Sequence, residues 1–374
     1  MTHDAQQGHK PCLLFVSRKW PPAVGGMETY SVELAETLRD HFDVHLQVLP
    51  GRQDGHPPGL PAYGLFLLRT MLACLLRGRA YERVVFTDLL LFPAAVCHRM
   101  VAPRARRVVV VHGLDLVYQQ RRGALSRAYG AFFALFRACQ GVFSAIVANS
   151  RNTAALAERA GLRRVVVVNP SLPRGDLVGA APSAADLPAN WPAQGPRILY
   201  FGRLVPRKGA LWFAQSVLPS LPGDCEFVVV GHGPDADYRD TLRRCERTRC
   251  LGRVDARPLA AMIRAADVVV MPNVATPDAV DVEGFGLAAV EASALGGRLL
   301  ASAIDGIPDA VADGVTGTLV PSGNATAWVR ATEAALDAAF DATDDDARER
   351  VAAATRALHS RDRQLAAFLQ LFPD

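Results

Sequence analysis

Two glutamates enclose a glycine-rich segment, Glu283-Gly-Phe-Gly-Leu-Ala-Ala-Val-Glu291. The segment predicts a helix that starts near Gly286, with Glu283 in the preceding loop and Glu291 one to two turns inside. Carboxylates accept hydrogen bonds from sugar hydroxyls, and the NH groups of Phe285, Gly286 and Leu287 suit an anion. The segment predicts a site for a ligand with hydroxyls and phosphates. The alternative is a capping glutamate followed by a surface glutamate.

A basic turn, Phe201-Gly-Arg-Leu-Val-Pro-Arg-Lys-Gly209, follows an apolar run and precedes a helical pattern. Arg203 can bind a phosphate through two hydrogen bonds, and Lys208 adds a second positive charge. Together they could stabilise a departing diphosphate. Because ligands bind beyond the carboxyl ends of parallel strands, this position favours phosphate binding over a solvated basic loop.

The first half of the chain offers two further candidates. Gly25 and Gly26 precede a helical pattern, so they either let backbone NH groups approach a phosphate or only make a tight turn. His112 follows the run 107–111 and either contacts a substrate or forms a structural hydrogen bond. Asp115, three residues later, either orients His112 or caps the next helix.

Two series of strands and helices must position these residues. Apolar runs predict strands at 13–17, 44–49, 83–87, 107–111, 144–148 and 164–168, and then at 197–201, 225–230, 267–271, 298–302 and 316–320. The valine runs at 107–111 and 165–168 do not alternate, which predicts parallel strands covered on both faces. We expect an α/β protein with two Rossmann-like, doubly wound domains facing a central cleft.

Composition divides the chain into four parts. An N-terminal domain is predicted for 1–173, a linker rich in proline, alanine and glycine for 174–196, and a C-terminal domain for 197–345. The last part, 346–374, predicts helices that pack back towards the N-terminal domain.

Charge is distributed unevenly. Residues 1–175 carry 22 Lys and Arg against 11 Asp and Glu, whereas the remainder carries 19 against 26. Arginines are interleaved with apolar residues in the first half, namely Arg69, Arg77, Arg79, Arg83, Arg99, Arg104, Arg106 and Arg107. This pattern is typical of a surface that meets anionic lipid headgroups, or of a solvated arginine-rich face.

The sequence gives no signal for export or metal binding. The first ten residues lack the order of a secretory signal, and the apolar stretch 60–76 is interrupted by Arg69 and is short for a membrane span. We expect a cytoplasmic protein, with contact to the inner membrane face at most. The seven cysteines show no CxxC spacing, which predicts reduced thiols and no metal site. Asp235-Ala-Asp237 is interpreted as a helix cap.

Six segments resemble the motifs of family 4 retaining glycosyltransferases and follow that family's order along almost the whole chain. They are the Gly25-Gly26 loop, Val111-His-Gly-Leu-Asp115, Arg203 with Lys208, Val229-Val-Gly-His-Gly-Pro234, Glu283 to Glu291, and Ala312-Asp-Gly-Val-Thr-Gly317. The resemblance implies the GT-B fold, metal-independent transfer and retention of anomeric configuration. The segment Asn169-Pro-Ser-Leu-Pro173 departs from the family pattern.

The resemblance also implies residue roles. Arg203 and Lys208 would bind the donor diphosphate, Glu291 the ribose and Glu283 the transferred sugar, while His112 would lie beside the reacting sugar. The catalytic residues are then His112, Arg203, Lys208 and Glu283. Donor contacts would come from Gly25, Gly26, Gly231, Val254 near the base, Phe285, Gly286, Leu287 and Glu291.

The implied activity is transfer of a hexosyl group from a UDP- or GDP-sugar to a glycan or lipid-linked acceptor, in cell-surface polysaccharide or glycolipid synthesis. Neither a cofactor nor a nucleic-acid partner is expected. Alternatives with the same fold are a nucleotide-sugar epimerase, a phosphorylase and a non-catalytic nucleotide-sugar-binding protein. The sequence offers no acid/base pair for an epimerase and no cofactor lysine for a phosphorylase. A degenerate binding protein should have lost Arg203, Lys208 or a glutamate, and all are present.

Overall fold

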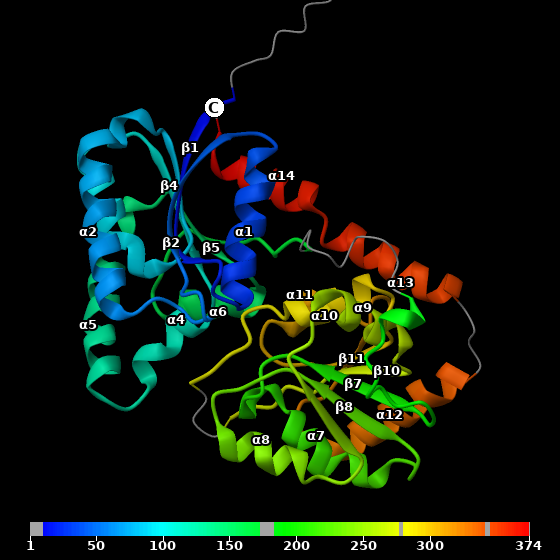
Figure 1. Ribbon diagram of the computed structural model, residues 1–374. Helices are drawn as coiled ribbons and strands as arrows, with labels where there is room; N and C mark the ends of the chain where they lie inside the picture. Colours follow the sequence, from blue (N-terminus) through cyan, green and yellow to red (C-terminus); the bar gives the residue numbers. More distant parts are fainter. Residues whose placement is uncertain (1–9, 173–182, 277–279, 341–344, 374) are drawn as a thin grey trace, which may run out of the picture. The chain divides into compact units, whose positions relative to one another are not determined.

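A computed structural model describes residues 10–172, 183–276, 280–340 and 345–373. The chain forms two compact units, described separately below. Unit 1 comprises the described residues of Met1–Asn149, Thr153–Ser171 and Arg361–Asp374, and unit 2 those of Ser150–Asn152 and Leu172–Ser360. Each unit contains a six-stranded parallel sheet with helices on both faces (Figure 1). The predicted α/β class with two doubly wound domains is therefore confirmed.

The sheet of unit 1 has the strand order β2-β1-β3-β4-β5-β6. Its strands are β1 (Cys12–Trp20), β2 (Asp43–Pro50), β3 (Arg83–Phe86), β4 (Arg106–Val111), β5 (Ala145–Ala148) and β6 (Val165–Val167). In β4, the four valines from Val108 to Val111 are fully buried, as a strand covered on both faces requires.

Helices cover both faces of this sheet because successive strand residues point to opposite sides. They are α1 (Gly26–Arg39), α2 (Leu60–Arg77), α3 (Phe92–Val101), α4 (Leu114–Val117), α5 (Ala124–Cys139), α6 (Arg151–Arg159) and α14 (Arg361–Leu371). One core contains Val109 and Val111 with side chains of α2, α3 and α5. The other contains Val108 and Val110 with side chains of α1 and α14.

The sheet of unit 2 has the order β12-β11-β10-β7-β8-β9. Its strands are β7 (Arg197–Phe201), β8 (Glu226–Val230), β9 (Thr248–Gly252), β10 (Val268–Met271), β11 (Leu299–Ser302) and β12 (Thr318–Val320). Its helices are α7 (Ala210–Ser216), α8 (Ala236–Arg243), α9 (Ala256–Ala265), α10 (Leu287–Ala294), α11 (Ile307–Ala310), α12 (Ala325–Phe340) and α13 (Asp345–Leu358). One core packs α7, α8 and α12 on the sheet, and the other packs α9, α10 and α11.

Two edge strands differ from the sequence-based expectation. Strand β9 was not predicted, because each of its residues is only half-buried and its sequence lacks an apolar run. Strand β6 was predicted to be covered on both faces, but it lies at the edge of its sheet, and Val166 and Val167 are each 38% exposed. A run of valines alone therefore did not distinguish an edge strand from a central one.

The C-terminal helices divide between the units. Helix α13 belongs to unit 2, whereas α14 belongs to unit 1 and buries Phe368 in its core. Arg361 at the start of α14 pairs with Asp40 at 3.3 Å, and its Nε donates to Thr37 Oγ1 at 3.1 Å. Of the predicted linker, residues 174–182 lie outside the described residues. Asp344, the first residue of the run Asp344-Asp-Asp346, also lies outside them, and α13 begins at Asp345.

Helix α2 continues into a short 3-10 turn. Together they form a stretch of 21 residues, Leu60–Ala80, that contains an 18-residue window with a mean hydropathy of 1.4 and is long and apolar enough by those measures to cross a membrane. The expectation that this stretch is too short was therefore wrong. However, Phe66, Thr70 and Cys74 on one side of α2 are buried in unit 1, as for a helix that covers a sheet.

Candidate functional site

The sheet of unit 2 has a switch point between β7 and β10. From β7 the chain crosses to β8 on one side, and β10 lies on the other side. The loops that leave the carboxyl ends of two such strands diverge, which opens a crevice where ligands of doubly wound sheets bind. The predicted cations follow β7 and the predicted glutamates follow β10. The strand order therefore places both groups at the same point of the sheet.

Glycine allows the chain after β7 to lie against the chain after β10. Gly209 has a φ of 74°, and a Cβ there would lie 1.8 Å from the carbonyl oxygen of Pro272. The NH of Val274 donates to the carbonyl oxygen of Arg207 at 2.9 Å. This close approach brings Arg207 and Lys208 next to Asn273.

The carboxylate of Glu283 is the centre of the resulting polar cluster. Its Oε2 lies 2.5 Å from Arg207 Nη1 and 2.6 Å from Lys208 Nζ, and it accepts a hydrogen bond from Asn273 Nδ2 at 3.1 Å. The side chain of Glu283 is only 13% exposed. Burial raises the pKa of Glu283, but the charges of Lys208 and Arg207 outweigh burial and lower the pKa to about 2.

The backbone of Glu283 is fixed by the turn after β11. Its NH donates to Asp305 Oδ2 at 2.9 Å, and its carbonyl oxygen accepts from the NH of Gly306 at 3.0 Å. Asp305 has a positive φ of 54°, which is unusual for a residue other than glycine. Such a conformation persists only where the surroundings hold it, and it is often found at functional sites.

Helix α10 begins as predicted. Gly286, with a φ of 106°, is its N-cap, and Leu287 is its first residue. Phe285 is buried, so the backbone rather than this side chain is available to a ligand. The first NH groups of α10 have no acceptor within the helix, and the helix dipole favours an anion there.

Glu291 lies one turn inside α10 and has the opposite acidity from Glu283. Its side chain is half-buried. Burial raises its pKa to about 7, although the charge of Lys208 opposes the increase. The structure thus brings Lys208, Glu283 and Glu291 together, while the exposed Arg203 forms no ion pair with any residue that the structure describes.

Two predicted donor contacts have clear packing roles. Gly231 has a φ of 143°, and a Cβ there would lie 1.8 Å from the carbonyl oxygen of Gly202. Val254 follows β9 and packs partly buried against the core under α9 and α10. Both residues lie beyond the carboxyl ends of strands, but these observations explain their types without a ligand.

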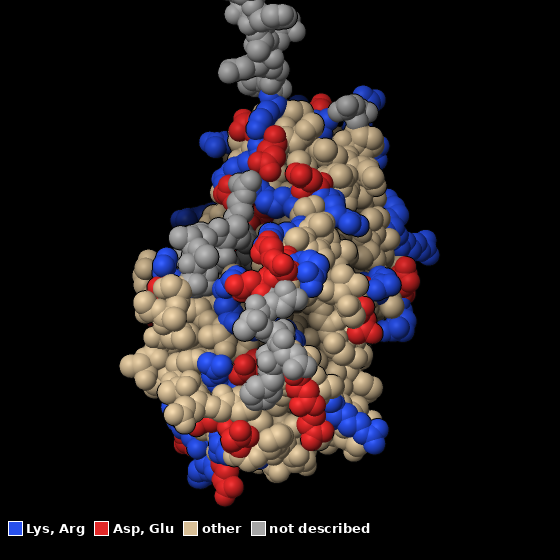
Figure 2. Space-filling view, turned by 90° about the vertical axis from the view of Figure 1, so that its right-hand side faces the viewer, with Lys and Arg blue, Asp and Glu red and all other residues tan. Residues whose placement is uncertain are grey.

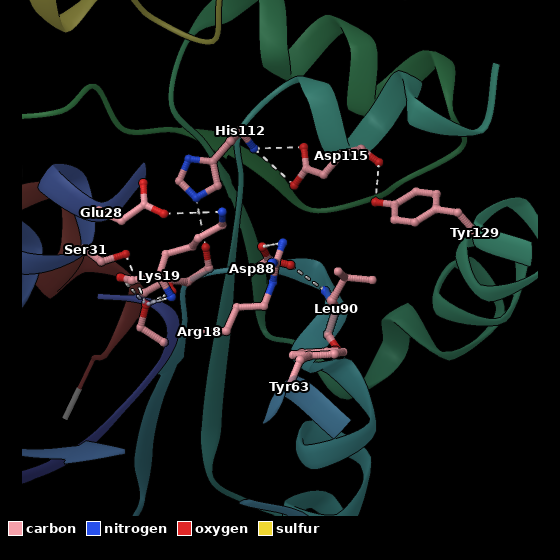
Figure 3. A network of polar contacts seen from close by, with 12 residues as sticks. Arg18, Lys19, Glu28, Ser31, Tyr63, Asp88, Leu90, His112, Asp115 and Tyr129 are labelled. Atoms are coloured by element: carbon pink, nitrogen blue, oxygen red, sulfur yellow. Dashed lines mark hydrogen bonds and ion pairs between the residues drawn. The ribbon is translucent and has the colours of Figure 1, made fainter. Parts of the chain in front are cut away.

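Unit 1 has its own polar cluster at the switch point between β1 and β3 (Figure 3). Arg18, after the apolar run of β1, pairs with the fully buried Asp88 at 2.5 Å. Lys19 pairs with Glu28 of α1 at 3.3 Å. A Cβ on Gly25, the N-cap of α1, would lie 2.6 Å from Glu28 Oε2. The α1 N-terminus where Gly25 and Gly26 were predicted to bind phosphate is therefore already next to a carboxylate.

His112 lies between this cluster and α1. Its Nε2 is 2.8 Å from the carbonyl oxygen of Thr87, which can only accept, so Nε2 carries the proton and Nδ1 is an acceptor. The edge of one ring faces the other between His112 and Tyr30, with 5.2 Å between ring centres. Burial lowers the pKa of His112, which favours the neutral ring. His112 therefore forms a structural hydrogen bond through Nε2, and its Nδ1 is still available for contact with a substrate.

Asp115 contacts His112 through the backbone and does not cap α4. Its carboxylate accepts from the backbone NH of His112 at 3.0 and 3.2 Å, and the N-cap of α4 is Gly113. Burial raises the pKa of Asp115 to about 7. Asp115 therefore fixes the backbone at His112 rather than the imidazole ring.

Sequence reasoning missed several members of these clusters. Arg207 stands in the basic turn beside Lys208, so its type and position were a usable signal. Asp281, whose Oδ1 lies 3.3 Å from Arg207 Nε, and Asp305 had no local pattern that marked them. Arg18 and Asp88 could be paired only once the order of β1 and β3 was known. Arg107, counted among the surface arginines, is buried and donates to the carbonyl oxygens of Val142 and Ala102.

Metal ligands do not converge on either cluster within the described parts of the chain. One group of three potential ligands occurs elsewhere, formed by Cys12, Asp43 and His45. Both ring nitrogens of His45 already have partners, Tyr81 and Asp43. Asp235 accepts from the NH of Tyr238 at 3.1 Å and is the N-cap of α8, so its predicted capping role is confirmed.

Comparisons with solved structures define the class of fold. Sucrose-phosphate synthase from Thermosynechococcus elongatus matches 97% of this chain and 98% of its own, with a TM-score of 0.71 and 21% identity. The structure of Anabaena HepE in complex with UDP matches with a TM-score of 0.69 and 18% identity, over 96% of this chain and 99% of its own. At these identities the likeness shows the fold alone, which is GT-B.

Sequence comparisons give the family. Residues 195–338 match the family model of the glycosyl transferases group 1. Phosphatidyl-myo-inositol mannosyltransferase of Mycobacterium leprae is 35% identical over 49% of this chain and 46% of its own length. D-inositol 3-phosphate glycosyltransferase of Xylanimonas cellulosilytica is 32% identical over 61% and 56%. The matches thus span about half the length of these relatives. Residues 195–338 therefore carry the similarity to the glycosyl transferases group 1.

Proposed function

We propose that the protein is a retaining glycosyltransferase that moves a hexosyl group from a UDP- or GDP-sugar to a glycan or lipid-linked acceptor. The proposal is supported chiefly by the convergence of Lys208 and Arg207 on Glu283 at the switch point of unit 2. Two cations and a carboxylate in a partly buried site match a ligand that carries both phosphates and hydroxyls.

The chemical task is to break the bond between the anomeric carbon and a diphosphate that leaves with increasing negative charge. In this proposal Arg203 and Lys208 bind the diphosphate and stabilise that charge, with the NH groups at the α10 N-terminus as further donors. Lys208 exchanges its contact with Glu283 for the phosphates. Arg207, which also contacts Asp281, stays with Glu283.

The two glutamates then bind hydroxyls on either side of the diphosphate. Glu283, held ionised by its cations, accepts from hydroxyls of the transferred sugar, and Glu291 accepts from the ribose. The low pKa of Glu283 keeps its carboxylate ionised, so that both oxygens can accept hydrogen bonds. A protonated carboxyl group would instead present a hydrogen-bond donor to the sugar hydroxyls. Glu291 accepts fully only when its own proton has left, near pH 7.

We further propose that unit 1 binds the acceptor and that His112 contacts the transferred sugar. Its Nδ1 accepts a hydrogen bond from a hydroxyl of that sugar, as expected for a ring whose Nε2 donates to Thr87. Retention follows from attack by the acceptor oxygen on the face that the diphosphate leaves. The acceptor's proton passes to a departing phosphate oxygen, so that no enzyme nucleophile is required.

The proposal is tested by mixing the purified full chain with UDP, GDP and ADP and their hexose conjugates. A ligand that binds only the folded state raises its melting temperature. Lys208→Gln should remove most of this shift, whereas Arg330→Gln, an exposed residue of α12, should leave it intact. If no nucleotide raises the melting temperature of the wild-type chain, the proposal is wrong.

Product analysis separates the alternatives with the same fold. A transferase releases nucleotide slowly without acceptor and faster with one, and its product keeps the donor's anomeric configuration. An epimerase instead converts the nucleotide sugar into an isomer, a phosphorylase requires inorganic phosphate, and a binding protein causes a thermal shift without turnover. Any of these three results would replace the proposed activity.

A further inference from the structure

Helix α2 has an unusual apolar outer surface. Leu65, Leu68, Leu72 and Leu76 recur at helical spacing and are 51%, 64%, 56% and 73% exposed. We call these four residues the leucine stripe. Leu60 and Leu75 beside it are 74% and 39% exposed. A helix that only covers a sheet should be polar on its outer face, so a contiguous apolar stripe indicates a contact with something else.

The inner side of the same helix holds it in unit 1. Phe66 and Cys74 are buried in the core with β1, β3, β4, α3 and α5. At the start of the helix, the hydroxyl of Tyr63 donates to the carbonyl oxygen of Leu90 at 2.8 Å. Extracting α2 to cross a bilayer would expose this core. The leucine stripe is therefore suited to lie in the plane of an interface rather than to span one.

Charge identifies the kind of interface. From residue 60 to residue 150 the chain has twelve arginines, no lysine, and the acidic residues Glu82, Asp88 and Asp115. Asp88 is the buried partner of Arg18 and the half-buried Asp115 accepts from the NH of His112, while α2, α3 and α5 contain no acidic residue. By contrast, acidic and basic residues are interspersed on the face shown in Figure 2.

Exposed arginines accompany the leucines. On α2 these are Arg69 and Arg77. Helix α5 covers the same side of the sheet and exposes Leu125 and Leu135, which are 62% and 55% exposed, together with Arg127 and Arg137 (Figure 1). A second copy of this face would bring arginines against arginines without a compensating carboxylate. An anionic bilayer supplies both the negative charge and the apolar layer.

We propose that the leucine stripe and its arginines dock unit 1 onto an anionic lipid surface, with α2 lying in the interfacial plane. This docking would place the enzyme next to a lipid-linked acceptor, and that part of the inference rests on the function proposed above. Leucines enter the headgroup boundary while arginine stems lie along it and their guanidinium groups reach the phosphates.

The test measures cosedimentation of the full chain with vesicles. Vesicles of phosphatidylcholine with phosphatidylglycerol should bind the wild-type chain, those of phosphatidylcholine alone should bind it much less, and added salt should weaken the binding. Leu68→Gln with Leu72→Gln should lower the partition at least roughly tenfold, because each side chain loses its apolar transfer. Arg69→Gln with Arg77→Gln should abolish the preference for the anionic vesicles.

Matched controls lie in unit 2. Val315 is an apolar residue that is 56% exposed, and Arg330 is an exposed arginine, so Val315→Gln and Arg330→Gln should bind vesicles as the wild type does. All substituted side chains are exposed, so the melting temperatures should stay close to that of the wild type. Failure of the wild type to bind anionic vesicles, or equal binding by the leucine variant, would overturn the proposal.

Two further measurements keep the outcomes distinct. Sedimentation velocity should show a monomer without lipid. If the wild type forms a dimer and the leucine substitutions dissociate it, the leucine stripe binds a second copy of the chain rather than a membrane. The nucleotide-dependent thermal shift should be the same in the leucine variant and the wild type. Vesicle binding without any nucleotide shift would refute the proposed activity and leave the docking surface supported.

Discussion

Glu283 and Glu291 are the same residue type, eight positions apart, and the fold gives them opposite acidities. Burial raises the pKa of each, although Glu291 is only half-buried. Arg207 and Lys208 contact Glu283 directly and lower its pKa to about 2. Among the described residues, the charge that opposes the effect of burial on Glu291 is that of Lys208, and the pKa of Glu291 is about 7. Proximity of cations, rather than burial, decides which carboxylate stays ionised at neutral pH.

Donor binding should therefore depend on pH through Glu291. If its carboxylate accepts from the ribose, KM for the donor should rise as the pH falls below about 7, and Glu291→Gln should remove this dependence. Because the pKa of Glu291 is higher in the folded state than its ordinary value of 4.5, the protonated side chain favours the folded state. This contribution to the free energy of unfolding is lost as the pH rises from 4.5 through about 7. Unliganded Glu291→Gln should thus gain more in melting temperature at about pH 8 than at about pH 5. An equal gain at both pH values would contradict the assignment.

Arg207 should act by positioning Glu283. Arg207→Gln removes one of the cations that hold Glu283 ionised, so kcat/KM should fall by roughly tenfold or more and the acid limb of its pH profile should shift upward. Arg207→Lys keeps the charge but lacks the fork that reaches both Glu283 and Asp281, and should rescue part of the loss. Affinity for the nucleoside diphosphate without sugar should change little. A parallel loss of that affinity would mean that Arg207 itself binds the phosphates.

The sequence predicted part of this site for an identifiable reason. Glycine pairs, basic turns and spaced glutamates are local patterns, so Lys208, Glu283, Gly286 and Glu291 could be selected without coordinates. The partners Asp281 and Asp305 could not, because their roles depend on which loops the strand order brings together. His112 was selected as well, although its bond to Thr87 comes from a different strand end.

At the scale of elements, the site depends on how closely two loops approach. The turn after β7 can lie against the chain after β10 only if position 209 lacks a side chain. The same requirement explains the glycine at this position without reference to a ligand. Central strands were predicted well because burial on both faces imposes apolar runs, whereas β9 and β6 show that edges carry a weaker or misleading pattern.

Replacing this glycine should be severe. Gly209→Ala combines a φ of 74° with a Cβ only 1.8 Å from a carbonyl oxygen, so the loop must move. The control is Gly323→Ala, which has a φ of 70° and nothing within 4 Å of the added Cβ. The control should lose about 1–2 kcal/mol of unfolding free energy from backbone strain alone. Gly209→Ala should lose clearly more in denaturant unfolding, and with it the nucleotide-dependent thermal shift. Equal losses would show that the close approach is unimportant.

At the scale of the whole chain, each unit is built from segments that are not continuous in the sequence. Composition predicted two successive domains, and the two sheets do occur in that order. The last helices were expected to pack back towards the N-terminal domain, and the described chain after Ser360 lies in unit 1. The particular contacts of Phe368 and Phe372 with Phe42 and α1 could not be read from composition, because composition does not say which core residues a terminal helix meets.

Removal of residues 361–374 should therefore give the two units different melting temperatures. The deletion exposes the apolar surface of Leu34, Leu38 and Phe42 and removes the contact of Arg361 with Asp40. Unit 1 should melt at a markedly lower temperature, because core burial that no other described segment replaces is lost. The residues proposed to bind the donor all lie in unit 2 apart from Gly25, Gly26 and His112, so a UDP- or GDP-dependent shift should persist in a second, later transition. Removal of Pro373 and Asp374 alone is the control and should leave both transitions in place. A single transition with no nucleotide shift would show that unit 2 cannot hold its site without α14.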